Sequence, residues 1–236
     1  MSYALEPIGI VRSGFREKFG IPRQPGLVSK MPADLEIFPP FDRDEAFRGL
    51  EGFSHVWILF VFHANAQRNS WKPTVRPPRL GGNTRLGVFA TRSGFRPNPI
   101  GMSAVSLEGF SRKKGRLVLH LRGVDLLDGT PVLDIKPYLP YADSLPHATG
   151  GFADTRPATD KDVTFTPEAE QACRDAELDH PGFSEIVVQL LRSDPRPAYR
   201  GGCPDGKDFG LALYDRNVRG VCEHERIIVT EITKTP

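Results

Sequence analysis

The chain has 236 residues, of which 39% are hydrophobic and 25% are charged, and its formal net charge is +2. That length and composition describe an ordinary globular protein, with room for one large domain or for one domain and a small appendage. The longest apolar run, 56–62, is too short to span a bilayer, and the N-terminus lacks the basic region and apolar stretch of a secretory signal. We therefore expect a cytoplasmic protein without a membrane segment.

The first part of the chain predicts short β-strands and very little helix. Residues 54–63 give the strongest strand prediction, because the run VWILFVF is β-branched, aromatic and apolar on both faces, like a buried central strand. Weaker strands are expected over 5–13 and 35–38. Residues 18–27 are punctuated by Gly and Pro, which indicates an irregular loop, and 42–47 predicts a short helix or turn.

The middle of the chain continues in the same style. A long loop with Pro and Arg covers 65–83, and strands are then expected over 85–91, 102–110, 117–124 and 131–138. Short strands at this spacing, with no amphipathic helix between them, favour an antiparallel barrel or sandwich over a doubly wound sheet. We predict a mainly β fold, with residues 1–145 forming a small antiparallel β-barrel.

The composition changes after the predicted barrel. Residues 146–161 are rich in Ala, Asp, Pro, Gly and Thr and indicate a linker. A helix is expected to begin at Pro167, with Thr166 as its N-cap, and a second helix covers 181–192 with an apolar stripe of period 3.6. With short strands around these helices, 162–236 predicts a small α+β C-terminal domain.

The small net charge hides an asymmetry along the chain. Residues 52–107 contain no Asp or Glu, whereas they carry seven cations: Arg68, Lys72, Arg76, Arg79, Arg85, Arg92 and Arg96. The rest of the chain is therefore negative. If these cations gather on one surface, they predict an anionic partner, with nucleic acid first in line.

A rigid loop lies inside this basic segment. A strand is expected at 88–90, and after it Pro97 and Pro99 hold the residues before them extended. A loop with so little conformational freedom is typical of a binding site. Its polar side chains are Arg92, Ser93, Arg96 and Asn98.

Several common motifs are missing. The sequence has no Gly-x-Gly-x-x-Gly, no P-loop and no Gly-x-Ser-x-Gly, which argues against dinucleotide, P-loop and nucleophile-elbow chemistry. The cysteines, Cys173, Cys203 and Cys222, include no Cys-x-x-Cys pair, and the six histidines show no metal-ligand spacing. We expect three ordinary thiols in a reducing compartment, no disulfide framework and no metal.

The remaining polar motifs fall in the early loop and at expected strand ends and turns. A barrel mouth would bring strand ends together into one site. The motifs are Arg23-Gln24-Pro25, Phe62-His63, Arg92 with Arg96, the turn 125–128, and the run from Asp134 through Lys136 to Tyr138.

On three of these runs the chain resembles the TsaA-like (YaeB/TrmO) family of S-adenosylmethionine-dependent tRNA methyltransferases. The runs are PRQPG, GVFATRSGFRPNPIG and DGTPVLDIKPY, and DPRPAYR at 194–200 resembles the family's C-terminal domain. One departure is Ser93-Gly94-Phe95, where many relatives have Ser-Pro. The resemblance implies methylation of N6 of threonylcarbamoyl-adenosine at position 37, chiefly in threonine tRNA, by a homodimer whose cofactor lies near the subunit interface.

The resemblance also implies residue roles. It assigns the S-adenosylmethionine pocket to ten residues: Arg23, Gln24, Pro25, Phe62, His63, Arg92, Asp125, Leu126, Leu127 and Asp128. Chemically, Asp125 or Asp128 suits the ribose hydroxyls or the ammonium of the cofactor, and the fork of Arg92 suits its carboxylate.

The acceptor nitrogen is ureido-like and poorly nucleophilic, which favours a general base. His63, Asp128 and Tyr138 are the candidates, and the sequence does not choose among them. Contacts with phosphates or the threonyl carboxylate are expected from other basic residues: Arg96, Lys136, Arg196 and Arg200. In the rigid loop, Arg92 is thus expected on the cofactor and Arg96 on the tRNA.

Two alternatives stay open. A non-catalytic RNA-binding barrel would also use a basic segment and rigid loops. A methyltransferase of this fold acting on another substrate would share the cofactor residues.

Overall fold

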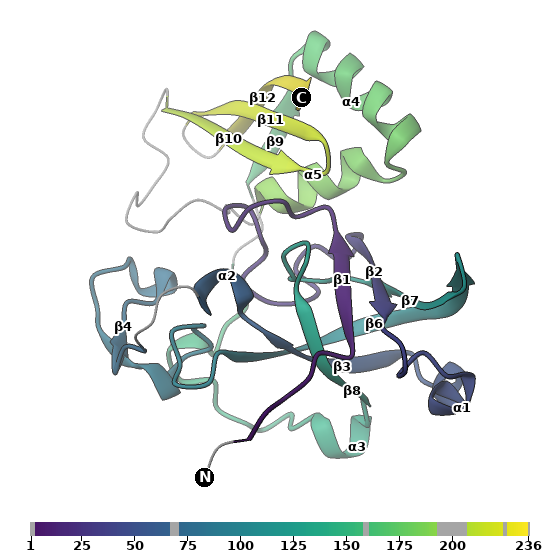
Figure 1. The fold of residues 1–236 in the computed structure, drawn as a ribbon. Helices are drawn as coiled ribbons and strands as arrows, with labels where there is room; N and C mark the ends of the chain where they lie inside the picture. The colour runs from purple at the N-terminus through teal and green to yellow at the C-terminus, as the bar shows by residue number, and fades with distance from the viewer. Residues whose placement is uncertain (1–2, 67–70, 158–160, 193–206, 224–225, 236) are drawn as a thin grey trace.

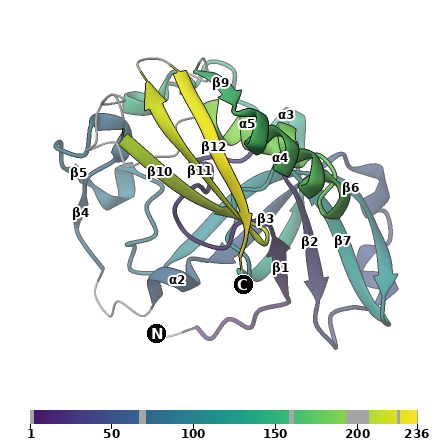
Figure 2. The same ribbon diagram turned by 90° about the horizontal axis from the view of Figure 1, so that it is seen from above.

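The computed structural model describes residues 3–66, 71–157, 161–192, 207–223 and 226–235. Figure 1 shows a β-barrel with a smaller unit of helices and sheet lying against one side of it, and Figure 2 shows that this unit lies across the barrel. None of the described helices is long and apolar enough to cross a membrane.

Six antiparallel strands close into the barrel in the order β1-β2-β7-β6-β3-β8, as the sequence predicts. Alternate residues of β3 face the interior, so that Val56, Ile58 and Phe60 are buried, and β3 pairs with a strand on either side. The strands are β1 (Gly9–Ser13), β2 (Pro32–Ile37), β3 (His55–Val61), β6 (Ile100–Lys113), β7 (Arg116–Arg122) and β8 (Pro131–Pro137).

Short elements decorate the barrel: α1 (Asp44–Phe47), η1 (Leu50–Gly52), α2 (His63–Ala66), β4 (Thr74–Val75), η2 (Pro78–Leu80), β5 (Leu86–Gly87), η3 (Val88–Ala90), α3 (Pro140–Asp143) and η4 (Gly151–Ala153). The strand predicted at 88–90 is wrong, because these residues form the 3₁₀ helix η3. Val88 is buried and Phe89 exposed, while both the amide and the hydroxyl of Thr91 donate to the Val88 carbonyl and close the turn.

The C-terminal unit is a four-stranded sheet with two helices, again as predicted. The sheet has the order β10-β11-β12-β9, with β9 parallel to β12; α4 packs mainly against β12, and α5 packs against β9. Thr166 caps α4 by accepting a hydrogen bond from the Ala169 amide. The elements are β9 (Asp162–Phe165), α4 (Pro167–Asp179), α5 (Phe183–Arg192), β10 (Lys207–Leu213), β11 (Arg216–Glu223) and β12 (Arg226–Lys234).

Strand β11 is not predicted from the sequence. Its inward positions include Arg216 and Gly220, so the strand lacks the apolar alternation that would reveal it. Arg216 is buried because its guanidinium pairs with Asp179 at 2.5 Å and with Asp215 at 2.6 Å.

The two units share one apolar cluster and are joined by backbone hydrogen bonds. Phe15 forms a β-bridge with Leu213, and the Tyr214 amide donates to the Gly14 carbonyl at 2.7 Å. The approach is close: a Cβ on Gly20 would lie 1.9 Å from a methyl carbon of Leu211. The C-terminal unit therefore packs on the segment that follows β1.

The cysteines differ from expectation at one position. Cys173 is buried and free, but Cys222 is disulfide-bonded. The prediction of three ordinary thiols is therefore wrong, because an odd cysteine count still allows one pair. Cys203 lies outside the described residues. Within the described residues, no group of three or more His, Cys, Asp and Glu side chains could hold a metal ion.

Candidate functional site

A cavity of about 420 Å³ opens at the end of the barrel where β3 leaves and β6 begins. The irregular loop after β1 and the connection between β7 and β8 complete its walls. Eight of the ten predicted cofactor residues line this pocket: Arg23, Gln24, Phe62, His63, Arg92, Asp125, Leu126 and Leu127. Since these residues come from four separate stretches of the chain, barrel closure is what brings them together.

Asp125 is the acid of this pocket. The Ser103 hydroxyl, 2% exposed as a residue, donates to Asp125 Oδ1 at 2.7 Å. Burial raises the pKa of Asp125 from 3.8 to about 6, although the Ser103 hydrogen bond and the nearby charge of Arg92 act in the opposite direction. A carboxylate desolvated to this degree favours a cationic or hydroxyl-bearing ligand that would compensate it.

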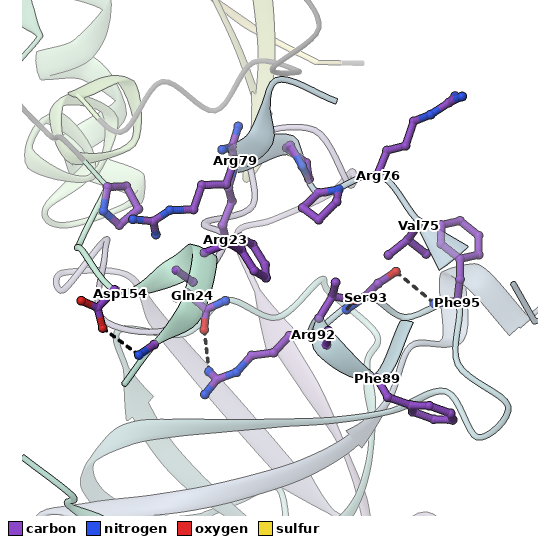
Figure 3. Close-up of a pocket in the computed structure, with 18 of the residues that line it drawn as sticks. Arg23, Gln24, Val75, Arg76, Arg79, Phe89, Arg92, Ser93, Phe95 and Asp154 are labelled. Carbon is purple, nitrogen blue, oxygen red and sulfur yellow. Dashed lines mark hydrogen bonds between the residues drawn. The ribbon is translucent and has the colours of Figure 1, made fainter. Parts of the chain in front are cut away.

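Arg92 and Gln24 stand at the opening of the pocket. Arg92 Nη1 donates to Gln24 Oε1 at 2.6 Å, and the arginine side chain remains exposed (Figure 3). This hydrogen bond joins the early Arg-Gln-Pro loop to the rigid loop of the basic segment. Both side chains also line a second cavity, so they form the border between the two.

Two other predicted cofactor residues lie outside the pocket. Pro25 lines only the second cavity. Asp128 accepts hydrogen bonds from the Ser13 amide at 3.1 Å and from Arg16 Nη1 at 2.6 Å, so both of its oxygens are engaged. Asp128 therefore holds the turn that carries Asp125 rather than facing the pocket.

The structure places Lys136 and Tyr138 away from the other motifs. Lys136 lies at the end of β8 that pairs with the start of β3, and Tyr138 directly follows β8, whereas the pocket lies at the end of β3. The Tyr138 ring packs 5.7 Å from that of Trp57, and Lys136 pairs with Asp134 at 2.9 Å. Of the three candidate bases, only His63 lines the pocket.

Arg96 is turned inward. It donates to the Val88 carbonyl at 3.1 Å and to the Thr91 carbonyl at 2.6 Å, and its guanidinium lies over the Phe89 ring at 5.5 Å. These contacts brace the turn around η3. Contact between Arg96 and tRNA stays a prediction. Arg196 and Arg200 lie outside the described residues.

The second cavity is a wide cleft of about 1920 Å³, which we call the arginine cleft (Figure 3). Three stretches form its walls, 23–27, 72–95 and 150–157. Its cations are Arg23, Lys72, Arg76, Arg79, Arg85, Arg92 and Arg156, against the single acid Asp154. Five of these seven come from the acid-free segment, so the charges that cluster in the sequence also gather in space.

One wall of the arginine cleft, residues 150–157, is not predicted from the sequence. Arg156 and its neighbours fall in the stretch predicted as a linker, where a single Arg among Ala, Asp, Gly and Pro gives no signal. The structure fixes this stretch with short-range bonds, including one from the Gly150 amide to Asp154 Oδ1 at 2.7 Å.

A closed barrel with a narrow pocket containing an acid, bordered by a wide cationic cleft, has the features expected of a protein that binds a small charged ligand next to a polyanion. Comparison with known protein families identifies the family to which this chain belongs. The sequence model of the tRNA-methyltransferase O N-terminal domain matches residues 10–144, and that of the TrmO C-terminal domain matches residues 158–235. The chain belongs to the tRNA-methyltransferase O family.

Individual relatives agree over nearly the whole chain. The Escherichia coli K12 protein named tRNA (adenine(37)-N6)-methyltransferase is 51% identical over 218 residues, covering 92% of each chain. A Pseudomonas aeruginosa protein named "Putative S-adenosylmethionine-dependent methyltransferase RcsF" is 51% identical over 223 residues, also covering 92% of each chain. A crystal structure of TrmO from Pseudomonas aeruginosa superposes with a TM-score of 0.81 at 41% identity, covering 99% of this chain and 98% of that one.

Proposed function

We propose that this protein transfers a methyl group from S-adenosylmethionine to N6 of adenine 37 of tRNA, and that it does so in the cytoplasm. The observation that carries the proposal is the border at Arg92 and Gln24, where the narrow pocket meets the arginine cleft. A small ligand in the pocket and an RNA in the cleft would meet at that border. Family membership and the activity named for the Escherichia coli relative support the same reaction.

The residues of the pocket fit the proposed cofactor. Its volume of about 420 Å³ is within the range for small-molecule sites. Asp125 offers a desolvated carboxylate for the ammonium or the ribose hydroxyls, and Arg92 offers a fork for the carboxylate. Phe62, whose ring meets that of Phe60 edge-on at 5.1 Å, provides an apolar surface. The bound cofactor supplies an electrophilic methyl group, and the chain supplies its orientation.

We propose threonylcarbamoyl-adenosine as the acceptor, chiefly in threonine tRNA. Transfer needs the acceptor nitrogen in line with the methyl, so positioning supplies much of the rate. His63 is the base that we propose, because it lines the pocket while Asp128 is engaged by Arg16 and Tyr138 lies at the other end of β3. For the carboxylate of the threonyl group we propose Arg96, which also lines the pocket.

We further propose a homodimer built on the outer face of β3 and β6. There Leu59 pairs with Met102 and Val61 with Ile100, and Met102 is 52% exposed. Val61, Ile100 and Met102 also line the pocket, so a second subunit on this face would cover the cofactor. Light scattering should give twice the monomer mass, and a monomeric mass at working concentration would contradict the dimer.

Two measurements test the proposed function. Calorimetric titration should show S-adenosylmethionine binding, and no binding at millimolar cofactor would leave the non-catalytic RNA-binding barrel. Deletion of the gene, followed by mass spectrometry of nucleosides from bulk tRNA, should show threonylcarbamoyl-adenosine lacking one methyl group. An unchanged nucleoside profile with intact cofactor binding would instead favour a methyltransferase acting on another substrate.

A further inference from the structure

We propose that the arginine cleft receives the unpaired anticodon loop of the tRNA, with Arg76, Arg85 and Arg156 on its phosphates and one base stacked on Phe89. This inference rests on the proposed function, because it assumes a tRNA substrate. It goes further by stating which surface holds the RNA and which part of the RNA enters. Arg76 and Arg85 belong to the acid-free segment whose charge predicts an anionic partner, but the individual tRNA contacts predicted from the sequence include neither of them, nor Arg156 or Phe89.

Three cations of the arginine cleft are exposed and form no ion pair with the described residues. Arg76, Arg85 and Arg156 are exposed, and no hydrogen bond or ion pair with the described residues engages their guanidinium groups. Elsewhere on the barrel, cations are commonly neutralised, as in Arg112 with Asp44 at 2.6 Å and Arg122 with Glu108 at 3.2 Å. Unpaired like charges around one cleft repel each other, and a chain of phosphates relieves that repulsion while releasing its own counterions.

The walls of the arginine cleft are held in place by specific contacts. Arg79 Nη2 donates to Thr155 Oγ1 at 2.9 Å and also to the Thr155 carbonyl, which ties η2 to the opposite wall. On the other side, the Lys72 amide donates to the Phe95 carbonyl, and Lys72 Nζ lies over the Phe95 ring at 5.3 Å. The walls are thus held in place by contacts that leave the three unpaired arginines available.

Phe89 favours an unpaired RNA loop over a paired stem. Phe89 is 72% exposed although its neighbour Val88 is buried, so η3 is anchored while presenting a large ring at the cleft. Arg96 lies over the ring, held by two backbone carbonyls, and fixes its orientation. Cationic grooves with exposed aromatic rings bind single strands, because unpaired bases stack on such rings and paired bases do not.

The position of the cleft relative to the pocket also supports this inference. The two cavities share Arg23, Gln24, Thr91 and Arg92. A loop held in the cleft therefore lies directly beside the entrance to the proposed cofactor site. An unstacked base at its edge can pass Arg92 into the pocket without opening a duplex.

The charge test compares two matched double variants. Arg76→Gln/Arg85→Gln removes two cations from the cleft, whereas Arg48→Gln/Arg116→Gln removes two exposed cations beside α1 and at the β6–β7 hairpin, on the opposite side of the barrel from β4 (Figures 1 and 2). For an anticodon stem-loop RNA, we expect the cleft variant to bind about tenfold more weakly and its salt slope to fall by about 1.4. The control should match the unsubstituted protein. Equal slopes in all three proteins would overturn the inference.

The stacking test uses Phe89→Ala, which changes no charge and removes a ring that contributes little to the core. Affinity for the stem-loop should fall about tenfold, with the salt slope unchanged. Affinity for a fully paired duplex of equal length should not change. Equal losses for both RNAs would contradict stacking on an unpaired base.

These outcomes separate the inference from the function on which it rests. If the unsubstituted protein transfers no methyl to tRNA, the proposed function fails. If it methylates tRNA while Arg76→Gln/Arg85→Gln and Phe89→Ala retain its RNA affinity, only the assignment of the cleft fails. Binding of S-adenosylmethionine should be unchanged in every variant, which confirms that each remains folded.

Discussion

The pocket and the arginine cleft meet at Arg92, yet they differ in nearly every physical respect. The pocket is narrow, about 420 Å³, and its lining combines one buried acid, Asp125, with four cations, whereas the cleft is wide, about 1920 Å³, with seven cations and one exposed acid. The four cations of the pocket are Lys18, Arg23, Arg92 and Arg96. Closure of the barrel builds much of the pocket, and loops and 3₁₀ turns build the cleft. The difference matches the two proposed ligands: the buried acid suits the cationic group of the cofactor, and the cationic walls of the cleft suit a polyanion.

The largest effect is expected at the border, because Arg92 belongs to both cavities. Arg92→Ala removes the proposed partner of the cofactor carboxylate and leaves Gln24 without its hydrogen bond. We expect the Kd for S-adenosylmethionine to rise roughly 100-fold, as for loss of a charge-assisted bidentate contact. Calorimetry measures this value, with Arg48→Ala as the control. Unchanged cofactor affinity would remove Arg92 from the pocket chemistry.

A smaller effect is expected from the acid that distinguishes the pocket. Asp125→Asn keeps the shape and the Ser103 contact but removes the charge, so cofactor affinity should fall about tenfold. In the unsubstituted protein, affinity should rise with pH through about 6, because a cationic ligand favours the ionised carboxylate. The Asn variant should show no such rise. Asp42→Asn, near α1, is the matched control, and a persistent pH dependence in the Asp125→Asn variant would refute the assignment.

Asp125 also affects stability, and here the expected pH dependence is opposite: cofactor affinity rises with pH, whereas the free energy of unfolding falls. The pKa of Asp125 is about 6 in the folded protein against 3.8 in a free side chain, so the folded state keeps its proton longer as pH rises. The free energy of unfolding should therefore decrease by about 2 kcal/mol between pH 4 and pH 6. Denaturant titrations should show that Asp125→Asn lacks this decrease, and parallel curves for the two proteins would contradict it.

The smallest effect is expected on the far wall of the cleft. Thr155→Ala removes the hydroxyl that accepts from Arg79 but keeps the arginine charge. RNA affinity should fall only about twofold, because the bond is exposed and Arg79 keeps its second hydrogen bond to the Thr155 carbonyl, and the salt slope should stay the same. Fluorescence anisotropy across a salt series checks both values. A drop in slope would mean that the Arg79 charge depends on this contact to reach the RNA.

The two cavities also differ in how well the sequence predicts them. The pocket is accessible to prediction because its residues stand in long recognisable runs at the ends of strands, and because β-branched and aromatic residues mark strands such as β3. The positive character of the cleft is visible as an acid-free segment, but its shape is not. Arg156 approaches from a stretch with no periodicity, and Phe89 points outward because the turn at 88–90 is a 3₁₀ helix rather than a strand.

The same physical limit explains the other errors. The sequence does not reveal β11 because a buried Arg216 replaces an apolar residue, and only the contacts with Asp179 and Asp215 make that burial acceptable. Lys136 and Tyr138 are expected beside His63, but the antiparallel pairing of β3 and β8 separates them by the length of the barrel. Local pattern identifies a strand, whereas the end of the barrel at which its last residue lies depends on pairing partners far along the chain.

The packing of the C-terminal unit on the segment after β1 limits how this enzyme could be shortened. A barrel cut down to residues 1–145 would expose Phe15 and Met31, and would free the Gly14 carbonyl that now accepts from Tyr214. Arg23 and Gln24 lie in the same segment, between Phe15 and Met31. A shortened protein would therefore need polar replacements at Phe15 and Met31 and a stiffened loop, because removal of the C-terminal unit would otherwise loosen the loop that carries Arg23 and Gln24 at the opening of the pocket.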